Sequence, residues 1–240
     1  MKSTQPYQPL LLRVLHGLTG LCLLAAVLTA FWTYDTYDGR WGRIPLPEYS
    51  AIEGLHGTFG LYTLLIFPVL VIYAVRKGQR RLIQPDSFAK LAQMDKPIGW
   101  YSLNRIANTL SIFAVTFALF SGKMMDETWL PKGELYHQWY YAHLISWIVV
   151  VVCIALHVLI NARVGGTALL LSMFNWRFRK QDHPSLWYPQ TTTWLANFPR
   201  NKQVLWQYSN SGLMALEVFV LVSLIAAWII PLLEYVPSFL

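Results

Sequence analysis

Four histidines lie inside long apolar runs of this 240-residue chain, and imidazole nitrogen is a common metal ligand. Two of them, His143 and His157, stand fourteen positions apart in one run. At about 100° and 1.5 Å per helical residue, that separation returns to within about 40° of the same face, about 21 Å further along. One helix face therefore carries two imidazoles at two depths, which suits two stacked haems that each need an axial nitrogen.

The other two histidines share a sequence motif in which glycine stands at the first and fourth positions after the histidine. The two segments are His16-Gly17-Leu18-Thr19-Gly20 and His56-Gly57-Thr58-Phe59-Gly60. Glycine inside a helix costs about 1 kcal/mol relative to alanine, so its repetition suggests that a flat, bulky group such as a porphyrin lies against the backbone. The alternative is that small residues serve close helix packing and the histidines are buried polar residues. The presence of four such histidines favours a functional role over a packing role, because ionisable groups in membrane spans are energetically costly.

Composition predicts an integral membrane protein. The chain is 55% hydrophobic and 13% charged, with a mean hydropathy of +0.38, and its apolar residues form five runs long enough to cross a bilayer. The predicted spans are roughly 10–32, 55–75, 103–121, 139–160 and 213–233. We expect an all-α membrane helical bundle: a four-helix haem-binding core in residues 1–165, and a cytoplasmic loop and fifth transmembrane helix in residues 166–240, part of the same bundle.

The first run has a second interpretation, as a cleaved signal peptide. Lys2 and Arg13 precede its apolar stretch, and Leu28-Thr29-Ala30 resembles a cleavage site. The apolar stretch is too long for a signal peptide, and cleavage would discard His16, so we predict a retained span.

Basic residues predict the orientation. The N-terminal segment and the connections at 76–105 and 163–202 hold 15 of the 19 Lys and Arg residues, so these segments are expected in the cytoplasm and the C-terminus outside. With this topology His16 and His157 fall near the inner side, and His56 and His143 near the outer side. The charge bias thus pairs the histidines without using their positions. The net charge of +7 is explained by this asymmetry and by contact with anionic lipid, and gives no reason to expect nucleic acid as a partner.

Other residues narrow the possible chemistry. His137 lies in the water-exposed segment just before the fourth predicted span, and His183 lies in a polar loop, so neither is expected to bind a metal. Cys22 and Cys153 lie within spans and are expected to pack there. The chain has no Cys-x-x-Cys-His motif for covalent haem and no nucleotide-binding loop. Electrons would therefore come from another protein or a small diffusible molecule.

Over roughly residues 8–165 the chain resembles the bacterial di-haem cytochrome b561 and nickel-iron hydrogenase b-type cytochrome family, which includes cytochrome subunits of formate dehydrogenases. The resemblance rests on single histidines in the first two spans and two histidines fourteen apart in the fourth. It implies two non-covalent haem b groups and electron exchange with quinone. Carried over residue by residue, His56 and His143 would hold the outer haem, and His16 and His157 the inner one. The chain departs from many members by its fifth span and by a loose match at Tyr101-Ser102-Leu103-Asn104-Arg105.

A quinone site is predicted beside the inner haem. Asn104 and Asn108 are one turn apart at the start of the third span, and Asn161 is one turn beyond His157, so their amides can converge on a quinone carbonyl. Arg13, one turn before His16, is a candidate partner for a haem propionate. The alternatives are interhelical bonding or capping for the asparagines and ordinary anchoring at the inner surface for Arg13.

The connection from 164 to 212 interleaves aromatic and basic residues. We expect it to rest in the lipid headgroup region, although such a segment can also bind a partner. Its residues are Trp176, Arg177, Arg179, Lys180, Trp187, Tyr188, Trp194, Phe198, Arg200, Lys202, Trp206 and Tyr208.

These observations leave two functions from different classes. The favoured one is a di-haem b-type cytochrome of the bacterial plasma membrane that transfers electrons between an external redox partner and the quinone pool. That partner would be hydrogenase-like, a dehydrogenase or a soluble donor, and whether the protein itself acts as a quinone reductase or quinol oxidase stays open. The alternative is a non-redox assembly or transport protein whose histidines serve structure or proton relay.

The charge bias makes a testable prediction about topology. A reporter that works only in the periplasm should be active when it is fused after Leu240. A reporter that works only in the cytoplasm should be active when it is inserted in the 163–202 connection. The opposite pattern would reverse the inner and outer assignments of all four histidines.

Overall fold

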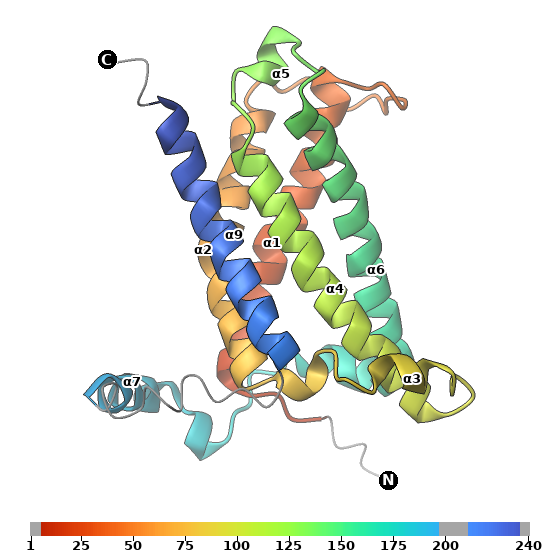
Figure 1. Cartoon of the computed structure of the whole chain (residues 1–240), viewed down its shortest axis with the longest axis vertical. Coiled ribbons are helices and arrows are strands. Elements are labelled where there is room, and N and C mark those ends of the chain that lie inside the picture. The colour runs from red at the N-terminus through yellow and green to blue at the C-terminus, as the bar shows by residue number, and fades with distance from the viewer. Residues whose placement is uncertain (1–5, 197–210, 236–240) are drawn as a thin grey trace.

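The computed structural model describes residues 6–196 and 211–235, and this part of the chain is helical without strands (Figure 1). Five of its helices are long and apolar enough to cross a membrane. They are α1 (Leu10–Tyr37), α2 (Ile52–Arg76), α4 (Pro97–Lys123), α6 (Gln138–Ser172) and α9 (Ser211–Tyr235). The all-α membrane bundle with five spans is thereby confirmed. We call the end of the bundle where α1 begins the inner end and the opposite end the outer end.

Shorter helices occupy the connections. They are η1 (Gln79–Arg81), α3 (Ser87–Leu91), α5 (Trp129–Lys132), η2 (Lys180–Asp182), η3 (Pro184–Leu186) and α7 (Trp187–Ala196). The aromatic and basic residues at 198–208 lie outside the described residues, as does the side chain of Trp194. Among those described, Trp176 and Tyr188 are exposed.

The helices extend beyond the predicted spans, and α6 does so most. It continues to Ser172, although its backbone departs from helical angles at Gly166, where φ is 61° and ψ is −165°. Hydropathy marks only the apolar part of a helix, whereas backbone hydrogen bonding continues past it, so the helix is longer than the predicted span of 139–160. The loop expected from 164 therefore begins as helix.

The core joins the four spanning helices that come after α1. A buried cluster contains Val71 of α2, Val115 of α4, Val150 of α6 and Val220 of α9. The antiparallel neighbours α1 with α2 and α4 with α6 pack together, and α9 lies against α2 and α4. Thr63, fully buried in α2, donates its hydroxyl to the Phe59 carbonyl of its own helix, which satisfies a polar group in an apolar surrounding.

An ion pair ties α9 to the bundle. The Arg76 guanidinium of α2 lies 2.8 Å from a carboxylate oxygen of Glu217, whose side chain is 3% exposed. A carboxylate buried in a membrane helix requires such a partner, so this contact fixes the position of α9 relative to α2.

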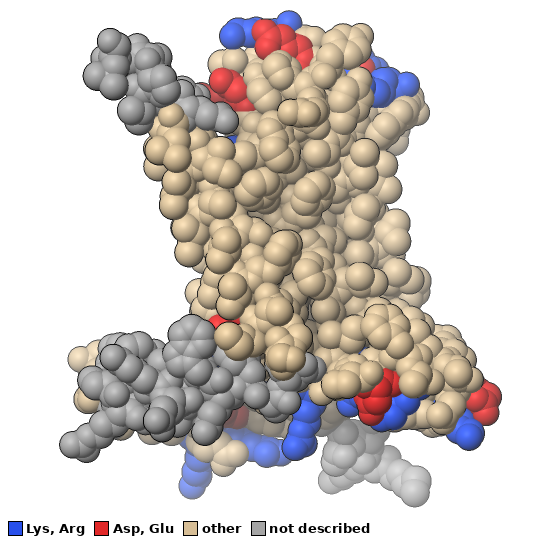
Figure 2. Space-filling view, in the orientation of Figure 1, with Lys and Arg blue, Asp and Glu red and all other residues tan. Residues whose placement is uncertain are grey.

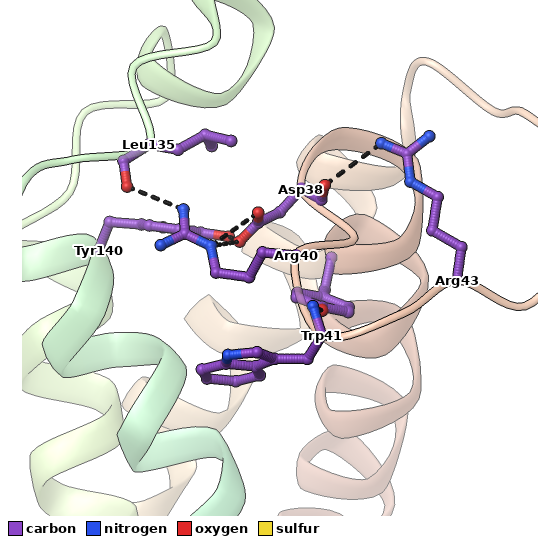
Figure 3. A network of polar contacts seen from close by, with 7 residues as sticks. Asp38, Arg40, Trp41, Arg43, Leu135 and Tyr140 are labelled. Atoms are coloured by element: carbon purple, nitrogen blue, oxygen red, sulfur yellow. Dashed lines mark hydrogen bonds and ion pairs between the residues drawn. The ribbon is translucent and has the colours of Figure 1, made fainter.

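On the face of the molecule shown in Figure 2, the coloured Lys, Arg, Asp and Glu side chains lie toward the two ends of the bundle, with a broad uncharged surface between them. At the outer end, Asp38 accepts hydrogen bonds from Arg40 Nε at 2.8 Å and from the Tyr140 hydroxyl at 2.6 Å, while Arg40 also donates to the Leu135 carbonyl (Figure 3). The hydrogen bond to Asp38 raises the pKa of Arg40 above its usual value. This network joins the α1–α2 connection to the start of α6.

Candidate functional site

The four intramembrane histidines meet as two pairs across helices. His16 of α1 faces His157 of α6, and His56 of α2 faces His143 of α6. The ring centroids are 5.9 Å apart in each pair. Helix α6 therefore contributes one imidazole to each pair, and the pairs lie at different heights along it.

The ring separation matches two imidazoles on opposite sides of one metal ion. A metal–imidazole bond is about 2 Å long, and the ring centre lies about 1.1 Å further, so two trans ligands place their centroids about 6 Å apart. Both pairs are at this separation, and the residues therefore fit haem iron bound between two axial histidines.

Glycines leave room for a flat group beside these rings. A methyl group placed on Gly17 or Gly20 of α1, or on Gly57 or Gly60 of α2, would meet no atom within 4 Å. These positions are open toward neighbouring space rather than packed against another helix, as a porphyrin plane requires.

A cavity of about 560 Å³ surrounds the outer pair, a size in the range of small-molecule sites. Its wall is mostly apolar, with His56 and His143 reaching into it. The lining also includes Gly57, Gly60, Leu64, Val115, Leu144, Trp147, Glu53, Asp126 and Glu127. It is therefore an apolar pocket lined by two imidazoles and a few charged residues.

Hydrogen bonding fixes the protonation of His56. Its Nδ1 lies 3.0 Å from the Ala26 carbonyl oxygen of α1. A carbonyl can only accept, so Nδ1 must carry the proton and Nε2 keeps its lone pair. This is the tautomer that a metal-ligating histidine needs.

His143 is held in the same tautomer by a serine. Its Nδ1 lies 3.1 Å from Ser121 Oγ, and Ser121 donates its own hydroxyl proton to the Ala118 carbonyl at 3.2 Å. With its proton on that carbonyl, the serine oxygen accepts from His143 Nδ1, and this arrangement again leaves Nε2 free. Ser121 is completely buried, so water does not compete for these contacts.

Asn108 fixes the tautomer of His157. Its side-chain amide nitrogen donates to the Arg81 carbonyl at 2.8 Å, which turns its oxygen toward His157 Nδ1 at 2.9 Å. Nδ1 of His157 is therefore the donor and Nε2 is available. Both groups of the Asn108 amide are engaged in these contacts.

The other predicted inner-end residues lie around the same pair. Asn104 donates to Asn161 Oδ1 at 3.3 Å, and Asn161 donates to the His157 carbonyl at 2.7 Å, while the buried Asn104 Oδ1 has no hydrogen-bond partner. Arg13 is 6% exposed, donates to the Arg177 carbonyl at 2.9 Å and leaves its buried Nε unpartnered. Polar groups with unused hydrogen-bonding capacity thus gather beside the inner pair.

The two remaining histidines lie apart from the pairs. His137 stacks on Trp129 with centroids 3.8 Å apart and faces Glu134. His183 bonds Ser185 within its own loop. Neither joins another histidine.

Two site residues were not predicted from the sequence. Ser121 orients His143, and a methyl group on Gly122 would lie 3.0 Å from Cε1 of the His143 ring. A serine and glycine near the end of the third span were the available signal, but only the packing of α4 on α6 gives them a role.

The comparison with protein families identifies the chain. The family model Ni_hydr_CYTB, described as prokaryotic cytochrome b561, matches residues 7–176. The chain therefore belongs to this family, and it is a membrane b-type cytochrome of electron transfer. Neither the search of curated proteins nor that of solved structures returned a match.

Gly122 offers a test of the site geometry. Gly122→Val should displace the His143 ring, because Ser121 prevents it from moving aside, and should remove the haem of the outer pair while the inner haem remains. Haem content and the reduced visible spectrum of the purified protein measure this. The control is Leu110→Val, at a lipid-exposed position of α4; equal haem loss in both variants would contradict the prediction.

Proposed function

We propose that this member of the prokaryotic cytochrome b561 family binds two haem b groups and passes electrons between a redox partner at the outer face and quinone at the inner side. The observation that supports this most strongly is the presence of two histidine pairs, each with 5.9 Å between ring centroids, at two heights on α6. Two such sites suit a relay across the membrane.

The residues have distinct tasks in this proposal. His56 and His143 would hold the outer haem, and His16 and His157 would hold the inner haem. Each bound haem supplies a one-electron iron couple. Ser121 and Asn108 hold ligand rings in the tautomer that leaves Nε2 free, and the apolar cavity wall excludes water from the outer pair.

Asn104 and Asn161 are the proposed quinone-binding residues at the inner side. Their mutual hydrogen bond is long, at 3.3 Å, and Asn104 Oδ1 has no partner. A quinone carbonyl can accept from the Asn104 amide, and the hydroxyl of a quinol can donate to its oxygen. Asn108 belongs to this site through the ring of His157 that it orients. Arg13, with its buried unpartnered Nε, is proposed to pair with an inner haem propionate.

The proposed orientation places the N-terminus in the bacterial cytoplasm and the C-terminus outside, from the distribution of basic residues. A hydrogenase-like protein, a dehydrogenase or a soluble donor would then reach the outer cavity, and quinone would take protons from the cytoplasmic side. Moving one electron inward against about 100 mV costs about 2.3 kcal/mol, so the reaction would conserve energy.

Histidine replacements test the number and place of the haems. His143→Ala should retain only the inner haem and His157→Ala only the outer one, because each removes one axial ligand. A pyridine haemochrome assay on purified protein measures haem per chain, and His137→Ala is the control that should keep both. Absence of haem b from the unmodified protein would refute the proposed function.

Asparagine replacements test the quinone site. Asn104→Leu should slow quinone-linked haem oxidation by about tenfold, the effect of losing a hydrogen bond to the substrate, without changing the haem spectrum. Asn108→Leu should instead alter the spectrum of the inner haem, since it frees the His157 ring. Stopped-flow spectra during oxidation by a soluble quinone report both the rate and the spectrum, and an unchanged rate in Asn104→Leu would exclude this site.

A further inference from the structure

We infer that charged side chains around the two histidine pairs give the outer haem a lower midpoint potential than the inner haem, so that electrons pass inward along a built-in gradient. The inference rests on the proposed function and adds to it the residues that set the direction. Both sites have two imidazole ligands, so the identity of the axial ligands cannot create a difference. It must arise from the surroundings of the ligands.

Carboxylates surround the outer pair. Glu53 precedes His56 by three residues on α2 and therefore lies on the same side of that helix. It lines the cavity together with Asp126 and Glu127, and the three carboxylates are near enough to interact electrostatically. Lys123 lines the cavity too, but its ammonium lies 4.8 Å from the centre of the Trp228 ring of α9. The charged groups around this cavity therefore sum to a negative charge.

Guanidinium groups surround the inner pair. Arg13 precedes His16 by three residues on α1 and is buried. Arg81 is connected to the other ligand, because its carbonyl binds Asn108, which binds His157, and its guanidinium donates to Gln8 just before α1.

Other charges lie further out at the inner end. The Arg179 guanidinium is 4.1 Å from the centre of the Tyr7 ring, and Asp182 accepts the Tyr7 hydroxyl. With Arg13, Arg81 and Arg179 against one carboxylate, these groups at the inner end carry a net positive charge.

The sign of the effect is set by Coulomb's law. Oxidation of haem iron adds one positive charge to the site. Nearby carboxylates stabilise that charge and lower the potential, whereas nearby guanidinium groups destabilise it and raise the potential. Inside an apolar bundle these fields are screened much less than in water.

Redox titration of the purified protein with its haem tests this inference. The visible spectrum recorded against applied potential should show two transitions, with the lower one absent from the His143→Ala variant, which keeps only the inner haem. Glu53→Gln should shift the lower transition upward and leave the higher one in place. Arg81→Gln should shift the higher transition downward.

The matched control is Glu134→Gln. Glu134 is also at the outer end but faces His137 and does not line the cavity, so this variant should shift neither transition. Two haems of equal potential, a lower transition that belongs to the inner haem, or no shift in Glu53→Gln would overturn the inference while leaving the di-haem proposal intact. A protein without haem would overturn both.

Discussion

The rest of the structure depends on how an imidazole is accommodated inside a membrane. Each ring has two nitrogens, and neither can rely on water there. At His56, His143 and His157 the protein binds Nδ1 through a carbonyl, a hydroxyl and an amide oxygen respectively. Each acceptor occupies Nδ1 and leaves Nε2 without that contact, and the rings of each pair lie 5.9 Å apart. The contacts that satisfy Nδ1 therefore also orient the paired rings.

This constraint explains why α4 is packed closely on α6 although α4 carries no member of either histidine pair. It supplies Ser121 to the outer pair and Asn108 to the inner pair, and its Gly122 permits close approach to His143. Helix α6 provides one histidine at each height, and α4 supplies a hydrogen-bond partner to both of them. Helices α1 and α2 complete the pairs from the opposite side.

Polar contacts at the ends keep this core aligned. At the outer end, Asp38 joins Arg40 and Tyr140, and so holds the α1–α2 connection against α6, whose Tyr140 also lines the outer cavity. Near the inner end, Arg76 and Glu217 attach α9 to α2. The Asp38–Arg40 pair lies at the end of the bundle, where water screens its charges. The buried carboxylate of Glu217 in α9 has the Arg76 cation beside it.

Sequence alone determined the membrane class, the five spans and the family resemblance, and it predicted the depths of His16, His56, His143 and His157. Hydropathy, helical periodicity and basic residues are local properties of the chain, so they can be evaluated without contacts. Tertiary structure decided what Ser121, Gly122 and Asn108 do, since each acts on a histidine of another helix. It also decided that α6 continues past residue 160 and breaks its helical angles at Gly166. These features depend on which helices lie side by side, because the hydrogen bonds and close approaches involved join residues far apart in the chain.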